Sequence, residues 1–136
     1  NANPTAFIMA NNTFQAVSTI GYPESRILLS QCAIYLATSP KSNASYMAIG
    51  NAQQLVKETG DLPVPIPLRN APTKLMKELG YGDEYKYSHD YANNFAEQEF
   101  LPDTISGTAF YVPGNNSREN GTREFLKNRW KDKYGY

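Results

Sequence analysis

Apolar residues recur every three or four positions through the first 60 residues, and this period predicts three helices, over about 4–20, 23–38 and 42–59. Residues that start or stop helices separate the three: Asn3, Pro4, Gly21, Pro23, Pro40 and Gly60. The connections on both sides of the middle helix are short. We therefore expect consecutive helices to pack antiparallel.

The first two predicted helices differ in how their apolar residues are distributed. The first has one apolar face, which we expect to be buried: Phe7, Ala10, Phe14 and Val17. Ile8 falls on its polar side and indicates a second contact surface. The second helix is apolar at nearly every angle around its axis: Ile27, Leu28, Leu29, Cys32, Ala33, Ile34, Leu36 and Ala37. Such a helix is a buried one, either at the centre of a bundle or against another subunit.

A small monomer has little other structure with which to cover the second helix. We therefore expect copies of the chain to associate through the first two helices, with an interface that includes Ile8, Ile27, Leu29 and Ile34. Cys32 lies in the same helix, and we interpret it as a small core residue, because a reactive thiol needs exposure and a basic neighbour.

The second half of the chain is less regular. Four prolines between Asp61 and Pro72 predict an extended stretch, and a short helix is expected over about 71–79, capped by Asn70. Residues 81–113 show no helical period but are rich in tyrosine and phenylalanine, whose rings can anchor an irregular segment to the helices. A last helix is predicted over about 117–133, which makes the whole chain all-α with one long irregular segment.

Composition excludes several classes of protein. The 136 residues suit one domain, here residues 3–136, and such a domain buries about two-thirds of its unfolded surface. One Cys and one His cannot form an internal disulfide or a tetrahedral zinc site. No apolar run approaches the roughly 20 residues needed to cross a bilayer. Asn1-Ala2 resembles the remnant of an expression tag, and the absence of an export signal predicts a cytoplasmic protein without membrane partners.

No catalytic, cofactor or metal site is predicted. Ser88-His89-Asp90 contains the residue types of a hydrolase triad, but consecutive side chains in an extended segment point apart and cannot converge. Neither glycine-rich phosphate-binding motif is present, so the chain should not bind ATP by a familiar route. We expect this chain not to be an enzyme.

Charge is concentrated in the second half of the chain. Residues 117–133 carry a net charge of +3, with Arg123, Lys127 and Lys131 spaced four apart on one face. Arg69, Lys74 and Lys77 form a second basic group. These side chains could contact nucleic-acid phosphates, or they could serve solubility and intramolecular pairing. The candidate nucleic-acid contacts are Lys74, Lys77, Arg123, Lys127 and Lys131.

Several strings, taken in order, resemble one known family. They are Ile20-Gly-Tyr-Pro-Glu-Ser-Arg-Ile27, Ile34-Tyr-Leu-Ala-Thr-Ser-Pro-Lys-Ser-Asn43, Leu62-Pro-Val-Pro, Leu68-Arg-Asn-Ala-Pro-Thr-Lys-Leu-Met76, Leu79-Gly-Tyr-Gly, Tyr85-Lys-Tyr-Ser-His-Asp90, Phe100-Leu-Pro-Asp103 and Phe110-Tyr-Val-Pro113. The ordered set is similar to the C-terminal region of the replication-associated recombination protein A family of AAA+ ATPases, which includes the Werner-helicase-interacting protein. The likeness covers residues 3–113 closely and the last helix more loosely.

The resemblance implies more than the residues do by themselves. The parent proteins of this family are AAA+ ATPases related to clamp loaders, which act at stalled replication forks in recombination and repair. By resemblance, this chain is a collar-like helical domain that assembles its parent into a homotetramer. ATP, magnesium and DNA would then be bound through domains that precede it, replication proteins would be possible partners, and the parent would be cytoplasmic and nucleoid-associated. The alternative is an auxiliary module that contacts DNA or a partner protein through the basic last helix.

Overall fold

The computed structural model describes all residues 1–136 and contains helices but no β-strand. Its α-helices are α1 Pro4–Ile20, α2 Ser25–Thr38, α3 Ala44–Thr59, α4 Lys74–Glu78 and α5 Ser117–Trp130. Four short 3-10 helices interrupt the segment between α3 and α5: η1 Ile66–Leu68, η2 Ser88–Asp90, η3 Ala92–Asn94 and η4 Asp103–Ile105. The prediction of an all-α fold is confirmed, whereas likeness to a clamp-loader collar stays a prediction.

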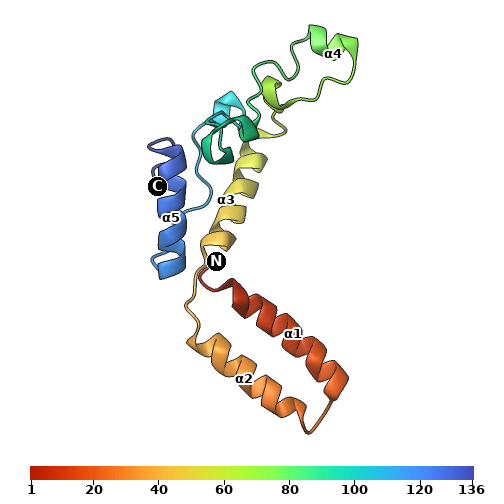
Figure 1. Ribbon diagram of the computed structural model, residues 1–136, viewed down its shortest axis with the longest axis vertical. Helices are drawn as coiled ribbons and strands as arrows, with labels where there is room; N and C mark the ends of the chain where they lie inside the picture. The colour runs from red at the N-terminus through yellow and green to blue at the C-terminus, as the bar shows by residue number, and fades with distance from the viewer.

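Helices α1 and α2 form an antiparallel hairpin that projects from the rest of the molecule, and we call residues 4–38 the arm (Figure 1). They are the only two α-helices that pack directly against each other. On α2 the buried residues are Ser25 and Cys32, two full turns apart on one narrow stripe. The interpretation of Cys32 as a buried residue is confirmed.

The predicted buried face of α1 is partly wrong. Ala10 and Val17 are half-buried, but the rings of Phe7 and Phe14 are 80% and 73% exposed. The positions of α1 that α2 covers carry mostly small side chains, which let two helices approach closely: Ala6, Met9, Ala10, Thr13, Ala16 and Val17. Both phenylalanines therefore lie to one side of the contact.

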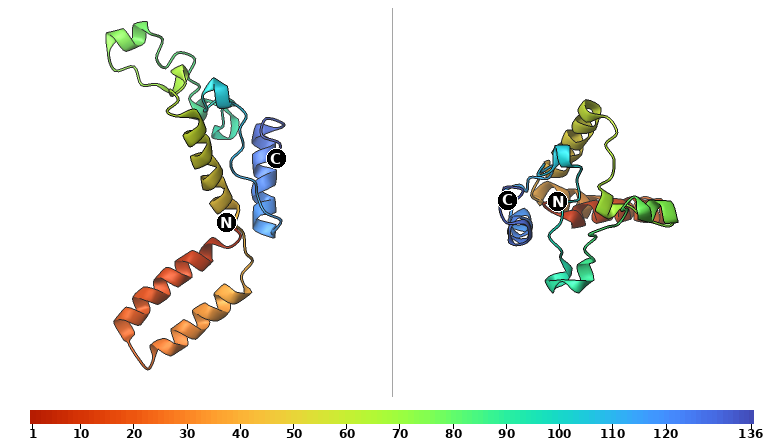
Figure 2. Two further views of the ribbon diagram at one scale, coloured as in Figure 1. Left: turned by 180° about the vertical axis from the view of Figure 1, so that it is seen from behind. Right: turned by 90° about the horizontal axis from the view of Figure 1, so that it is seen from above.

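The second predicted antiparallel pair, α2 with α3, does not form. After α2 the chain is extended at Ser39, because Pro40 disfavours a helical conformation in the residue before it. The Lys41 ammonium donates hydrogen bonds to the carbonyls of Leu36 and Ser39, which helps to end the helix. Helix α3 then leads away from the arm (Figure 2). A short connection was not sufficient to predict packing, because its backbone conformation sets the direction of the next helix.

The rest of the molecule is an elongated body. Helix α5 and the segment 95–113, which we call the strap, lie alongside α3, and the N-terminus lies where the arm meets this body (Figures 1 and 2). The segment that carries the short helix α4 extends beyond the end of α3, and the chain then returns towards α3 through η2 and η3 (Figure 1). The predicted helix cap at Asn70 is wrong: α4 begins at Lys74, and the Thr73 side chain accepts the Met76 N–H. Pro72 keeps the residue before it out of the helical region and so delays the helix.

Helix α5 is shorter than predicted. It is capped by Asn116, whose side chain accepts the backbone N–H of Glu119 at 3.0 Å. It ends at Trp130, because Lys131 adopts a positive φ of 52°. Lys131 therefore does not continue the helical face that begins at Arg123.

The molecule buries far less of itself than its length predicts. Only seven of the 136 residues are buried, and the accessible surface is 9963 Å². A compact monomer of 15.2 kDa exposes about 7,100 Å². The accessible surface is larger than that of a compact monomer because the arm and the segment that carries α4 project from the body without being covered by it. None of the helices is both long and apolar enough to cross a membrane.

Candidate self-association surface

The arm presents apolar side chains to solvent. Of the four residues predicted at the interface, Ile27 and Ile34 are 64% exposed, Ile8 55% and Leu29 42%. The structure thus places all four at the surface of a single chain, on neighbouring helices. Phe7 and Phe14 belong to the same exposed surface and were missed, although their spacing of two helical turns was visible in the sequence.

Both sides of the arm are apolar. On α2, Ile27 and Ile34 share one side because they are two turns apart, and Leu29 and Leu36 share another. Leu29 follows Ile27 by two residues, which rotates it by about 200° around the helix axis. One flat partner laid against the arm would therefore cover only one of these sides.

The arm is also nearly free of charge. Residues 1–39 contain only two charged side chains, Glu24 and Arg26. A surface without charges loses little hydration energy when it is covered, so burial of its apolar groups is a net gain. Depletion of charge is a property of the cores of protein interfaces.

A second apolar surface lies on the body. The C-terminal half of α3 and the strap enclose a groove of about 550 Å³. Its apolar lining includes Leu55, Val56, Leu62, Leu101, Ile105 and Phe110. This groove does not touch the arm of its own chain.

The linker between the arm and the body lies beside a buried carboxylate, that of Glu119. The Glu119 side chain is fully buried and accepts a hydrogen bond from the Tyr111 hydroxyl at 2.9 Å and another from the Asn116 amide. Ser42, in the linker between α2 and α3, and the backbone of Gly114 lie beside the same carboxylate and favour its ionised form. In the sequence, the spacing of Asn116 and Glu119 is a capping-box pattern, which could have indicated this position.

The hydrogen bonds change the acidity of Glu119. Burial by itself would raise the pKa of this carboxyl group. The donors outweigh burial and lower its pKa from 4.5 to about 2: Ser42, Asn116, Tyr111 and Gly114. Glu119 is therefore ionised at neutral pH in spite of its burial. The same surroundings act in the opposite direction on Tyr111, where burial first and then the Glu119 charge raise the pKa of the phenol.

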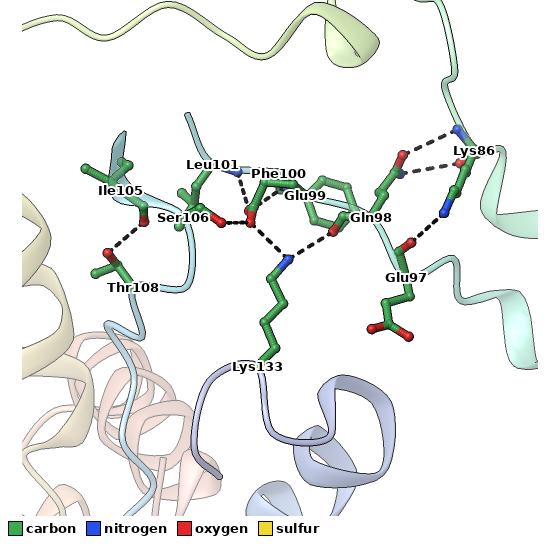
Figure 3. A network of polar contacts seen from close by, with 10 residues as sticks. All are labelled: Lys86, Glu97, Gln98, Glu99, Phe100, Leu101, Ile105, Ser106, Thr108 and Lys133. Carbon is green, nitrogen blue, oxygen red and sulfur yellow. Dashed lines mark hydrogen bonds and ion pairs between the residues drawn. The ribbon is translucent and has the colours of Figure 1, made fainter. Parts of the chain in front are cut away.

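A second polar network fastens the strap to the end of the chain (Figure 3). The Glu99 carboxylate forms an ion pair with the Lys133 ammonium at 3.0 Å and accepts hydrogen bonds from the Ser106 hydroxyl and the N–H groups of Phe100 and Leu101. Burial would raise the pKa of Glu99, but these contacts lower it to about 2. Glu99 is therefore not a solvated loop charge but part of the attachment between the strap and the end of the chain.

Aromatic rings support the same attachment. The Trp130 ring packs edge-on against Phe95, Phe100 and Tyr134, with centroids 4.9, 6.0 and 5.1 Å apart. The prediction that aromatic residues anchor the irregular segment is confirmed for Phe95 and Phe100. It is wrong for Tyr85, Tyr87 and Tyr91, which are exposed because the α4 region extends beyond the body.

The five candidate nucleic-acid contacts do not gather on one surface. Lys74 and Lys77 lie on α4, at the tip beyond α3, while the other three belong to the α5 region (Figure 1). The Arg123 guanidinium donates to the carbonyls of Pro113 and Gly114, and Lys131 pairs with Glu97 at 3.2 Å. Lys74 lies 3.8 Å from Glu78, whereas Lys77 and Lys127 have no ion-pair partner. A nucleic-acid role for these residues stays a prediction.

The three residues with the types of a hydrolase triad do not form one. Ser88, His89 and Asp90 share the 3-10 helix η2, and the His89 ring lies 5.1 Å from the Tyr87 ring without a hydrogen bond to Ser88 or Asp90. No group of three or more His, Cys, Asp or Glu side chains is arranged to hold a metal ion.

Comparison with known proteins gives consistent matches. The family model described as "MgsA AAA+ ATPase C terminal" matches residues 1–130. "Replication-associated recombination protein A" of Escherichia coli K12 is 43% identical over 127 residues, which are 93% of this chain and 28% of that protein. The protein of the same name from Coxiella burnetii is 41% identical over 128 residues, 93% of this chain and 29% of the relative. "ATPase WRNIP1" of Dictyostelium discoideum is 38% identical over 111 residues, 81% of this chain and 13% of the relative. The chain thus spans less than a third of the length of these relatives.

Proposed function

This chain belongs to the MgsA AAA+ ATPase C-terminal family, and from that membership we propose that it is the oligomerisation domain of a AAA+ ATPase. The resemblance inferred from the ordered sequence strings is confirmed by the match over residues 1–130. Relatives named for replication-associated recombination support a role of the parent protein in replication-fork maintenance, recombination and repair. The supporting observation for oligomerisation is the amount of surface that a single copy leaves exposed.

The exposed surface is large enough for stable association. The single chain exposes 9963 Å², about 2,900 Å² more than a compact monomer of its mass. Permanent subunit interfaces bury about 2,000–5,000 Å² in total. The excess surface of one copy is thus comparable with what such an interface removes from water. The arm contributes to it exposed apolar side chains that include Phe7, Phe14, Ile27 and Ile34.

The distribution of that surface favours an assembly larger than a dimer. The arm is apolar on two sides of α2, and the groove between α3 and the strap is a separate apolar surface. A single two-fold contact through one of these would leave the others exposed. A homotetramer, in which each copy has more than one neighbour, would cover more of them.

The parent's chemistry would take place outside this chain. Neither glycine-rich phosphate-binding motif is present here, so ATP and magnesium would be held by other parts of the parent protein. Contacts with DNA and with replication proteins are likewise proposed for the parent. In this proposal the chain contributes the association that places several ATPase units together.

Replacing Ile34 with glutamate is expected to dissociate the assembly while leaving the fold of the single chain intact. Ile34 is 64% exposed, so the monomer can hydrate a charge there, but an apolar contact cannot. We expect association to weaken by about 100-fold, a typical effect for a central interface residue. Sedimentation velocity at chain concentrations across the micromolar range measures the association. Circular dichroism shows whether the helical fold of the variant is retained.

The matched control is Asn128→Glu, which adds the same charge at an exposed position of α5. It should sediment like the unaltered chain. If the unaltered chain is a monomer at every concentration, or if Ile34→Glu and Asn128→Glu associate equally well, self-association through the arm is wrong.

A further inference from the structure

The direction of the arm is determined by a few contacts at its root. Neither α1 nor α2 packs against α3, α4 or α5, so no helix of the body holds the arm in place. Two connections lie at this root: the linker 39–43, which joins the arm to the body along the chain, and residues 1–3, which precede α1 at the same place. Asn3 joins these two connections, because its amide donates to the Ser39 hydroxyl at 2.9 Å and to the Tyr35 hydroxyl at 3.1 Å. The angle between the arm and the body therefore depends on the contacts that residues 1–3 and 39–43 make with the body.

Glu119 receives one of the two connections directly. Ser42 of the linker lies beside its carboxylate, which at the same time accepts a hydrogen bond from Tyr111 at the end of the strap. The other connection reaches the same group indirectly, because Asn1 lies near the Tyr111 hydroxyl and acts to lower the pKa of the phenol. One carboxylate thus joins the linker, the strap and the start of α5.

The surroundings of Glu119 are built closely around it. A Cβ atom added to Gly114 would lie 2.9 Å from a Glu119 carboxylate oxygen, so any other residue at this position would displace the carboxylate. Glycine therefore lets the backbone N–H of this position reach the carboxylate. The Arg123 guanidinium holds the carbonyls of Pro113 and Gly114 from the other side. A fully buried, ionised acceptor with donors from several segments orients all of them together.

We propose that the buried Glu119 carboxylate is a positioning residue that fixes the angle between the arm and the body. Through this angle it selects which neighbouring surfaces the arm can reach when copies of the chain associate. The second part rests on the proposed function, whereas the first part concerns the single chain. A flexible arm would pay more conformational entropy on association, so a fixed angle also favours assembly.

The test is a distance measurement between the arm and α5 in Glu119→Gln. Spin labels are attached at Ser18 on α1 and Asn128 on α5, both exposed, in a Cys32→Ala background that removes the one native thiol. Labelled chains are diluted with unlabelled ones, so that distances within one copy dominate the pulsed dipolar signal. An amide has one acceptor oxygen and cannot serve all the donors, so we expect a distance distribution about twofold wider than in the unaltered protein.

Glu124→Gln is the matched control, because this exposed carboxylate lies on the same helix without contact to the linker. Its distance distribution should equal that of the unaltered chain. A second label pair, Asn11 with Gln31 inside the arm, reports whether the hairpin stays folded. An unchanged arm-to-α5 distribution in a folded Glu119→Gln variant would overturn the proposal and leave Glu119 as a stabilising group only.

Two milder variants keep the test decisive should Glu119→Gln fail to fold. Ser42→Ala and Tyr111→Phe each remove one donor and retain the carboxylate. Each should widen the arm-to-α5 distribution while the Asn11–Gln31 distance stays constant; no widening in either would overturn the proposal. Sedimentation of the same samples distinguishes the fixed angle from the proposed oligomerisation. A widened distance distribution in a chain that never associates would support the fixed angle and contradict oligomerisation.

Discussion

Replacing Trp130 with alanine is expected to destabilise the chain by about 2–3 kcal/mol and to release the strap from α5. Trp130 is the one ring that contacts both Phe95 and Phe100, and the Lys133 ammonium lies 5.2 Å from its centroid. Its removal leaves both phenylalanines without their aromatic partner. In a molecule with only seven buried residues, few other contacts can compensate for the loss.

Urea unfolding at one fixed chain concentration measures this effect, since association makes the apparent stability depend on concentration. Hydrogen exchange shows which part of the chain is destabilised. In the variant, amides of the strap should lose protection before those of α1 and α2. Phe125→Ala is the control: this ring is on the same helix but is 52% exposed and contacts Arg129 rather than the strap. Equal destabilisation by the two substitutions would show that Trp130 does not hold the strap.

Acidification is expected to unfold the chain between about pH 4.5 and pH 2. Glu99 and Glu119 both have a pKa of about 2 in the folded chain against an ordinary value of 4.5, so the unfolded chain binds more protons in this interval. Folding stability is therefore fully present above pH 4.5 and falls as the pH drops through the interval. The loss is on the order of 2 kcal/mol for each carboxylate, with allowance for solvent screening at the partly exposed Glu99.

The free energy of unfolding measured at a series of pH values tests this directly. Glu119→Gln removes one of the two low-pKa groups, so its stability should be lower at neutral pH and depend about half as steeply on pH below 4.5. Glu124→Gln, which removes an exposed carboxylate of the same helix, should reproduce the unaltered curve. Parallel curves for the unaltered chain and Glu119→Gln would contradict the expected ionisation of Glu119.

The two carboxylates illustrate the limit of sequence reasoning for this site. Nothing local separates Glu99 from Glu97, and for Glu119 the only local signal is its capping-box spacing from Asn116. Their partners include Lys133, Ser42 and Tyr111, which lie 8 or more positions away along the chain. Only the folded backbone brings these groups together, so only the tertiary structure identifies the carboxylates that matter.

The same distinction holds for the helices. The extents of α1, α2 and α3 followed from apolar period, proline and glycine, because these act within a few residues. The position of α4 was missed through one local effect, the restriction that Pro72 places on the residue before it. Which side of α1 meets α2 depended on close approach between two helices, and there the two phenylalanines of α1 were misplaced.

From its sequence alone, this chain could be recognised as an all-helical member of a AAA+ ATPase family whose second helix carries more apolar surface than one copy covers. Those conclusions depend on residue types, short spacings and their order, which the sequence contains in full. The tertiary structure alone decided that the arm stands away from the body, that both sides of it face solvent, and that Glu119 joins its root to α5. The physical reason is range: helix formation is local, whereas the direction of a helix and the burial of a charge depend on groups far apart in the chain.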